Sequence, residues 1–338
     1  MRSFTGVLRW VAAAAVICVT GAGCAPASEN ESETASVPPS LSPAPAPSPP
    51  VAAQNQPAPN TPSPSPHGSH YNAGVEAAQS GHIDAAIEEF RKAIADDPRD
   101  VQAHHNLAVV LERKGDHDGA IGEFREALAL DPKLEIAHLM LADALAKKGD
   151  SDAAGEEYQA ALRLAPDDAR ANNNFGLLLR RQGNLDGAIE HYRRALATQP
   201  NSYPARMNLG SALFAKHNLQ AAAKELKAAI ALEPDSPASH DLLAHVLFEM
   251  KDPSSALEEW KRAAHLDGYN ADTLVGMSIA HWQLGQKTQA LNSYRSAVLL
   301  DRGYVCNHLK EQGHWKDPAL EILRQVKQAA GPTVCAGS

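Results

Sequence analysis

The sequence lacks the motifs that carry the chemistry of the common enzyme classes. It contains no glycine-rich phosphate loop, no Gly-x-Ser-x-Gly elbow and no Cys–His pattern of a catalytic thiol. It has 15 histidines, but none of them fall at the spacing of a metal site. We therefore expect a chain with no cofactor, no bound metal and no enzymatic activity.

Positive charge is also scarce in this sequence. Its 31 Lys and Arg residues are outnumbered by 40 Asp and Glu residues, which gives a net charge of −9. Proteins that bind nucleic acid contact the phosphate backbone through clustered Lys and Arg. The composition therefore argues against nucleic acid as a partner, while an apolar content of 44% suits a folded domain.

The apolar run at the N-terminus, WVAAAAVICVTGAG, is too short for a membrane span, which needs about 20 residues. Because Arg2 and Arg9 accompany it, we predict a secretory signal peptide over residues 1–23. The stretch GAGCAPAS that follows resembles the lipobox of bacterial lipoproteins, in which the signal is cut before a cysteine that carries the lipid. The resemblance implies an exported chain, anchored through Cys24 to the outer membrane or to the outer leaflet of the cytoplasmic membrane. The family usually has Leu where Gly21 stands, so conventional signal cleavage is the alternative.

Residues 24–66 are dominated by Pro, Ala and Ser and contain almost no large apolar side chain. Such a segment cannot bury enough surface to offset the entropy lost on ordering. We predict a disordered, extended linker between the lipid and a folded domain. Docking of the proline-rich tract on an aromatic groove is the alternative.

Prolines recur every 34 residues in the next part of the chain, at Pro98, Pro132, Pro166, Pro200 and Pro234. In a 34-residue frame that starts at residue 67 and puts these prolines at position 32, positions 20 and 27 are alanine in all seven repeats. Glycine occupies position 15 in five of the seven. Position 24 is large in each repeat: Phe90, Phe124, Tyr158, Tyr192, Leu226, Trp260 and Tyr294.

This pattern predicts a pair of helices in each repeat. Positions 20, 24 and 27 share one helical face, so a bulky side chain between two alanines lets two helices pack closely. Glycine at position 15 supplies the turn, and the proline ends the second helix. The residues expected to cap the second helix are Asp116, Asp150, Asn184 and Asn218.

The repeat resembles the tetratricopeptide repeat family, whose pattern has apolar residues at these positions and proline at position 32. The resemblance implies an all-α, right-handed α-solenoid of seven helix hairpins plus a C-terminal capping helix. Position 4, usually Trp in the family, is instead histidine at His70, His104, His138 and His240. The predicted repeats are 67–100, 101–134, 135–168, 169–202, 203–236, 237–270 and 271–304, within a repeat domain 67–304 that residues 305–338 follow.

The last repeat needs a cover for its apolar face, because repeats of this kind build a core only with their neighbours. The stretch KDPALEILRQVKQAAG, residues 316–331, has the helical apolar spacing of such a cap. Cys306 and Cys335 lie on either side of it. In an exported protein we predict that they form a disulfide, with two free thiols as the alternative.

The first helix of each repeat also presents a second face, which lines the concave groove that binds peptides in the family. Three sets of residues on this face are candidates for a partner-binding site. Each set also has an alternative without a partner: the apolar side chains pack against neighbouring helices, the asparagines bond locally, and the basic side chains are solvated. The sets are an apolar strip of Met207, Phe214, Phe248 and Trp282, extended by Val275 and Ile279; an asparagine ladder of Asn72, Asn106, Asn174 and Asn208; and a basic stripe of Arg113, Lys147 and Arg181, with Arg170 and Arg180 nearby.

These features together predict a non-enzymatic adaptor of the bacterial cell envelope. The expected partner is a protein or peptide in the concave groove, and the expected membrane contact is the N-terminal lipid. The competing function is a structural part of a secretion, pilus or polysaccharide-export machine that works through the convex surface. The sequence does not indicate an oligomeric state.

Overall fold

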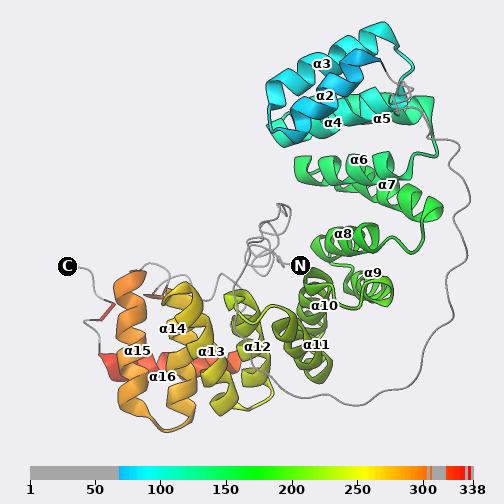
Figure 1. The fold of residues 1–338 in the computed structure, drawn as a ribbon. Coiled ribbons are helices and arrows are strands. Elements are labelled where there is room, and N and C mark those ends of the chain that lie inside the picture. Colours follow the sequence, from blue (N-terminus) through cyan, green and yellow to red (C-terminus); the bar gives the residue numbers. More distant parts are fainter. Residues whose placement is uncertain (1–67, 303–304, 307–316, 332–333, 336–338) are drawn as a thin grey trace, which may run out of the picture.

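The computed structural model describes residues 68–302, 305–306, 317–331 and 334–335 (Figure 1). The predicted signal peptide, Cys24 and the linker lie outside these residues. All regular structure in the described part of the chain is helical, so the predicted all-α class is confirmed. Within the same ranges, no helix combines the length and the apolar sequence that a membrane span requires.

The helices alternate between two sets, and each helix of the first set packs against the next helix in the chain. The first set, the A helices, comprises α2 (Ser69–Gln79), α4 (Val101–Lys114), α6 (Glu135–Lys148), α8 (Ala169–Arg181), α10 (Tyr203–Ala215), α12 (Pro237–Glu249) and α14 (Ala271–Gln283). The second set, the B helices, comprises α3 (Ile83–Asp96), α5 (His117–Leu130), α7 (Ser151–Leu164), α9 (Leu185–Thr198), α11 (Leu219–Leu232), α13 (Pro253–Asp267) and α15 (Lys287–Leu300). The last helix is α16 (Asp317–Ala330).

The turns between A and B helices follow the predicted chemistry. Gly115 ends α4 with φ of 88°, in the left-handed region that glycine adopts without a steric penalty. Asp116 then caps α5 by accepting a hydrogen bond from the Gly119 N–H. His217 and Lys251 replace glycine in two repeats and still adopt positive φ values of 60° and 63°. The pairs are joined at the predicted prolines, since each of α3, α5, α7, α9 and α11 ends two residues before one.

The core contains the alanines and large side chains of the B helices, as the repeat predicts, together with buried apolar residues of the A helices. In α13, Ala256 and Trp260 are completely buried. A Cβ added to Gly276 would lie 2.4 Å from Cε2 of Trp260, so the ring uses the space that this glycine leaves. The buried apolar residues form two large clusters, from residue 86 to 178 and from 188 to 330, besides a small third one, and Leu179 packs against both large clusters.

Histidine at position 4 connects three segments of the array. In α12, His240 Nδ1 lies 2.5 Å from Glu259 Oε2 on α13, and its Nε2 lies 2.9 Å from the carbonyl oxygen of Pro234. His104 and His138 make the same two contacts, at 2.6–2.7 Å to a glutamate and 3.2 Å to the proline carbonyl. Because a carbonyl only accepts, the contact with the proline requires a hydrogen on Nε2. This bridge explains how histidine replaces Trp here.

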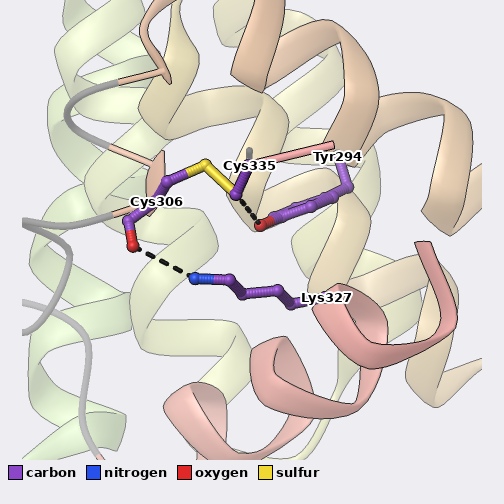
Figure 2. Close-up of a disulfide and its surroundings, with 4 residues drawn as sticks. All are labelled: Tyr294, Cys306, Lys327 and Cys335. Carbon is purple, nitrogen blue, oxygen red and sulfur yellow. Dashed lines mark hydrogen bonds between the residues drawn. A yellow bond between two sulfur atoms is a disulfide. The ribbon is translucent and has the colours of Figure 1, made fainter. Parts of the chain in front are cut away.

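The C-terminal helix α16 covers the end of the array. Ala319, Leu323 and Val326 are buried in the hydrophobic cluster that α14 and α15 also build. The predicted disulfide between Cys306 and Cys335 is present, with 5.8 Å between the two Cα atoms (Figure 2). The cap is therefore fastened both by apolar packing and by a covalent bond.

Candidate partner-binding surface

The A helices form one side of the array. Figure 1 shows a curved stack in which α8 and α10 lie on the inner side of the curve, with α9 and α11 outside them. Hydrogen bonds between successive A helices fix this surface. For example, Asn106 on α4 donates to the hydroxyl of Tyr71 on α2 at 2.9 Å. This side of each A helix therefore contacts the same side of the next A helix.

The asparagines at position 6 are committed to contacts between repeats. Besides the Asn106 bond, Asn208 Nδ2 donates to Asn173 Oδ1 at 3.0 Å, and Asn174 Nδ2 donates to Asp143 Oδ1 at 2.9 Å. Asn72, in the first described helix, is exposed. These three amide groups therefore each make a contact between repeats, and binding of an extended peptide by the asparagines stays a prediction. The contacts form because position 6 of one repeat lies beside position 5 or 9 of the preceding repeat.

The predicted apolar strip is not a continuous exposed surface. Phe248 is only 8% exposed, and its ring centroid lies 6.0 Å from that of Trp260. Met207 and Phe214 are half-buried against the same hydrophobic cluster, and Val275 and Ile279 are fully buried. Phe248 is thus a core residue that packs against the buried ring of Trp260 in the same repeat. The proposed contact of Phe248 with a ligand is corrected accordingly.

Trp282, the last ring of the predicted strip, is shared with the cap. Its indole Nε1–H donates to Gln325 Oε1 of α16 at 3.1 Å. Lys287 Nζ lies 5.6 Å from the ring centroid, in a cation–π arrangement. The half-buried ring therefore belongs to the junction between the last described repeat and α16.

The three side chains of the basic stripe, Arg113, Lys147 and Arg181, are exposed. Arg113 Nη1 donates to the carbonyl oxygen of Ala78 at 3.1 Å, and Lys147 Nζ pairs with Glu112 Oε1 at 2.6 Å. Both side chains reach back over the preceding A helix. Arg181 is exposed and forms no hydrogen bond or ion pair with another residue in the part of the chain that the structure describes.

Arg180, beside Arg181 on α8, is largely buried between α8, α9 and α10. Its Nη1 donates to Ser211 Oγ at 2.9 Å, while its Nε is buried and has no hydrogen-bond partner among the described residues. Burial lowers the pKa of the Arg180 guanidinium. No carboxylate of the described helices lies within ion-pair distance of it. We refer to Arg180 and Arg181 as the arginine pair.

Two acidic side chains of the preceding A helices, Glu112 and Asp143, are already paired within the array. Burial disfavours the charge of Glu112, but hydrogen bonds from His117 and Lys147 outweigh it and lower the pKa of this carboxyl. Asp143 pairs with Arg170 at 2.8 Å and accepts a hydrogen bond from Tyr158 at 2.6 Å. At the arginine pair, two adjacent cationic side chains lack a carboxylate within ion-pair distance among the described residues.

The structure also brings together three residues that the sequence analysis missed. Asp241 and His245 of α12 and Asp272 of α14 are buried, and each offers a ligand atom within 4.8 Å of the other two. The contact between Arg170 and Asp143 shows that position 2 of one repeat touches position 9 of the preceding repeat. This rule relates His245 to Asp272 in the sequence, because they stand in those positions.

Comparison with known proteins agrees with this architecture. Two models of the tetratricopeptide repeat match, one at residues 71–135 and 139–203 and the other at 179–246. The chain therefore belongs to the tetratricopeptide repeat family, whose solenoids are protein-interaction scaffolds. No match was found among curated proteins.

Several solved structures are similar to the fold. PilW, a widely conserved type IV pilus biogenesis factor, is 26% identical with a TM-score of 0.54, and the match covers 62% of this chain and 97% of PilW. PilF of Pseudomonas aeruginosa is 23% identical with a TM-score of 0.54, covering 65% and 100%. YrrB, a tetratricopeptide protein with an unusual peptide-binding site, is 21% identical with a TM-score of 0.51, covering 56% and 97%. The last two likenesses concern the fold alone.

Proposed function

We propose that this chain is a non-enzymatic adaptor of the bacterial cell envelope. Its A helices hold an acidic segment of a partner protein at the arginine pair. The observation that carries the proposal is that Arg180 and Arg181 have no carboxylate partner among the described residues, although Arg180 is largely buried. The signal peptide, a lipid on Cys24 and the linker would tether this surface to a membrane.

The chemistry of the arginine pair fits a carboxylate ligand. Burial of a guanidinium without a counter-ion is unfavourable, because the charge loses its hydration and no opposite charge compensates for that loss. A carboxylate accepts two parallel hydrogen bonds from a guanidinium, and such charge-assisted bonds contribute about 1.5–3 kcal/mol each. A partner segment rich in Asp and Glu would supply the missing acceptors for the exposed Arg181 and for any N–H of Arg180 that the ligand reaches.

Binding of an acidic peptide tests this proposal directly. A fluorescein-labelled decapeptide of Asp, Glu and Gly is expected to bind the wild-type chain, with affinity that falls as salt rises. Replacing Arg180 with Met and Arg181 with Ala should weaken binding by roughly tenfold or more, since tenfold corresponds to about 1.4 kcal/mol. The measurement is fluorescence anisotropy, and a Lys–Gly decapeptide is the ligand control.

The matched control variant lies on the outer surface. Arg193 and Arg194 are adjacent exposed arginines on α9, so replacing both with alanine removes the same charge from a B helix. The proposal requires that this variant bind the acidic peptide like the wild type. Equal losses in both variants would mean that net charge alone attracts the peptide, and the arginine pair would have no special role.

A second candidate function is an assembly factor for a pilus or a related export machine. The likeness to PilW, which covers almost all of that protein, favours this possibility. Such a factor would use the convex surface of B helices. The same two variants separate the functions. The convex surface is favoured if partner assembly is lost when Arg193 and Arg194 are replaced but is retained when the arginine pair is replaced.

Membrane attachment has its own test. Replacing Cys24 with Ser is expected to remove the acceptor of the lipid and to move the protein from the membrane fraction to the soluble fraction of the cell envelope. Metabolic labelling with radioactive palmitate should mark the wild type and not the variant. Label in neither chain, together with equal fractionation, would show that the signal is cut conventionally.

A further inference from the structure

The Asp–His–Asp cluster of Asp241, His245 and Asp272 has the composition of a metal site. Asp241 and His245 stand four residues apart on α12, so both side chains project from one helical face. Asp272 lies in the first turn of α14. All three are less than 10% exposed, and their ligand atoms lie within 4.8 Å of one another. Two neighbouring A helices thus contribute one nitrogen and at least two oxygen donors to one point.

The spacing inside this cluster differs from that of the ordinary ion pairs in the molecule. The other histidine–carboxylate pairs among the described residues have N–O distances of 2.5–3.1 Å. His245 Nε2 and Asp241 Oδ2 are 3.6 Å apart. Two ligands bound to one ion at about 2.1 Å, with a tetrahedral angle between them, are separated by roughly 3.4 Å. The separation is therefore wider than a direct hydrogen bond and close to the distance between two metal ligands.

The surroundings hold the histidine in place. The His245 ring meets Trp260 edge-on, with centroids 5.4 Å apart and planes at 88°. Trp260 is itself completely buried and fits against Gly276 of α14. A fixed imidazole is a better ligand than a mobile one, because little side-chain entropy is lost when the ion binds.

The charges of the cluster favour a divalent cation. Two carboxylates taken out of water repel each other and lose hydration. A divalent ion would balance both negative charges and link α12 to α14. A mixed set of imidazole and carboxylate donors suits zinc, iron or manganese, whereas calcium and magnesium prefer oxygen donors alone.

We propose that Asp241, His245 and Asp272 bind one divalent transition-metal ion, of which zinc is the probe to use first. Three protein ligands leave at least one coordination position for water or for a group from another molecule. The ion would stabilise the contact between the repeats of α12 and α14, because a ligand that binds only the folded state raises the stability of that state.

Metal titration of the full-length chain, purified with a chelator, tests this site. The wild type is expected to bind one Zn²⁺ per chain and to melt at a higher temperature with zinc than with excess chelator. Asp272→Asn and His245→Gln should each weaken binding at least roughly tenfold, since even the loss of a hydrogen-bond partner of a ligand costs 10–100-fold. Competition with a chromophoric chelator measures the affinity.

Two further measurements keep the result interpretable. His265→Ala removes an exposed histidine of α13 outside the cluster and should leave zinc binding unchanged. Replacement of zinc by Co²⁺ in the wild type should give visible absorption bands of a bound ion. This measurement does not depend on how any variant folds. A wild type that binds no zinc, a melting temperature indifferent to metal, or full binding by both ligand variants would each overturn the proposal.

Discussion

Replacing Trp260 with alanine is expected to lower the free energy of unfolding of the C-terminal repeats by about 4 kcal/mol. The ring is completely buried and contacts His245 and Phe248. Its removal leaves a cavity between α12, α13 and α14 that these packed helices fill only in part. Urea denaturation followed by circular dichroism measures the loss. A change below about 1 kcal/mol would show that the repeats repack around the gap, contrary to the close fit described here.

A matched pair of glycines sharpens this prediction. A methyl group on Gly276 would collide with the Trp260 ring, so Gly276→Ala should cost about 1–3 kcal/mol. Gly122, exposed on α5, has nothing within 4 Å of the added carbon, so Gly122→Ala should be neutral or stabilise by up to about 1 kcal/mol. The loss at Gly276 should largely disappear in a chain that already carries Trp260→Ala, because the two positions are coupled.

Loss of the disulfide is the second large effect that we expect. Replacing Cys306 and Cys335 with serine opens a loop with a sequence separation of 29 residues. The chain-entropy model gives a stabilisation of about 3.5 kcal/mol for such a loop. The apolar residues of α16 would then detach from α14 and α15 more often, because packing alone would hold them. Hydrogen exchange of the α16 amides, with and without reductant, measures this opening.

A neighbouring contact supplies the control for the disulfide. Lys327 Nζ donates to the carbonyl oxygen of Cys306 at 3.1 Å, beside the bond between the two sulfur atoms (Figure 2). Lys327→Ala removes this exposed hydrogen bond and leaves the loop closed. We expect it to change the opening of α16 by less than about 1 kcal/mol. Equal protection of α16 in the serine variant and the wild type would mean that the disulfide is not what holds the cap.

The helices, their turns and the cap were predictable because the residues that determine them lie close together in the sequence. Alanine at positions 20 and 27, glycine at 15 and proline at 32 act within one helix pair, where the spacing along the chain fixes the spacing in space. The pair Asp116 and Gly115 illustrates this, since both were placed correctly from the sequence alone. The disulfide followed from the number of cysteines left after the signal region.

The inner surface was less predictable, since its properties depend on contacts between repeats. Position 6 indicated which face Asn208 lies on, but not that Asn173 of the preceding repeat accepts its hydrogen bond. Position 12 placed Phe248 on the same face of its A helix as Asn208, but did not indicate that its ring packs against Trp260 in the core. The Asp–His–Asp cluster spans two repeats, so no local spacing reveals it. The missing counter-ion of Arg180 depends on three helices together, so no spacing within one repeat indicates it.

The division of the apolar core has a mechanical consequence. The two large clusters meet around α8 and α9, where hydrogen bonds such as Asn208 to Asn173 and Arg180 to Ser211 cross from α8 to α10. These two bonds are only partly buried, and partly buried hydrogen bonds are exchanged with water more easily than buried apolar packing is broken. The array should flex most readily at this junction, so a carboxylate seated on the arginine pair would also fix the distance between the two ends of the molecule.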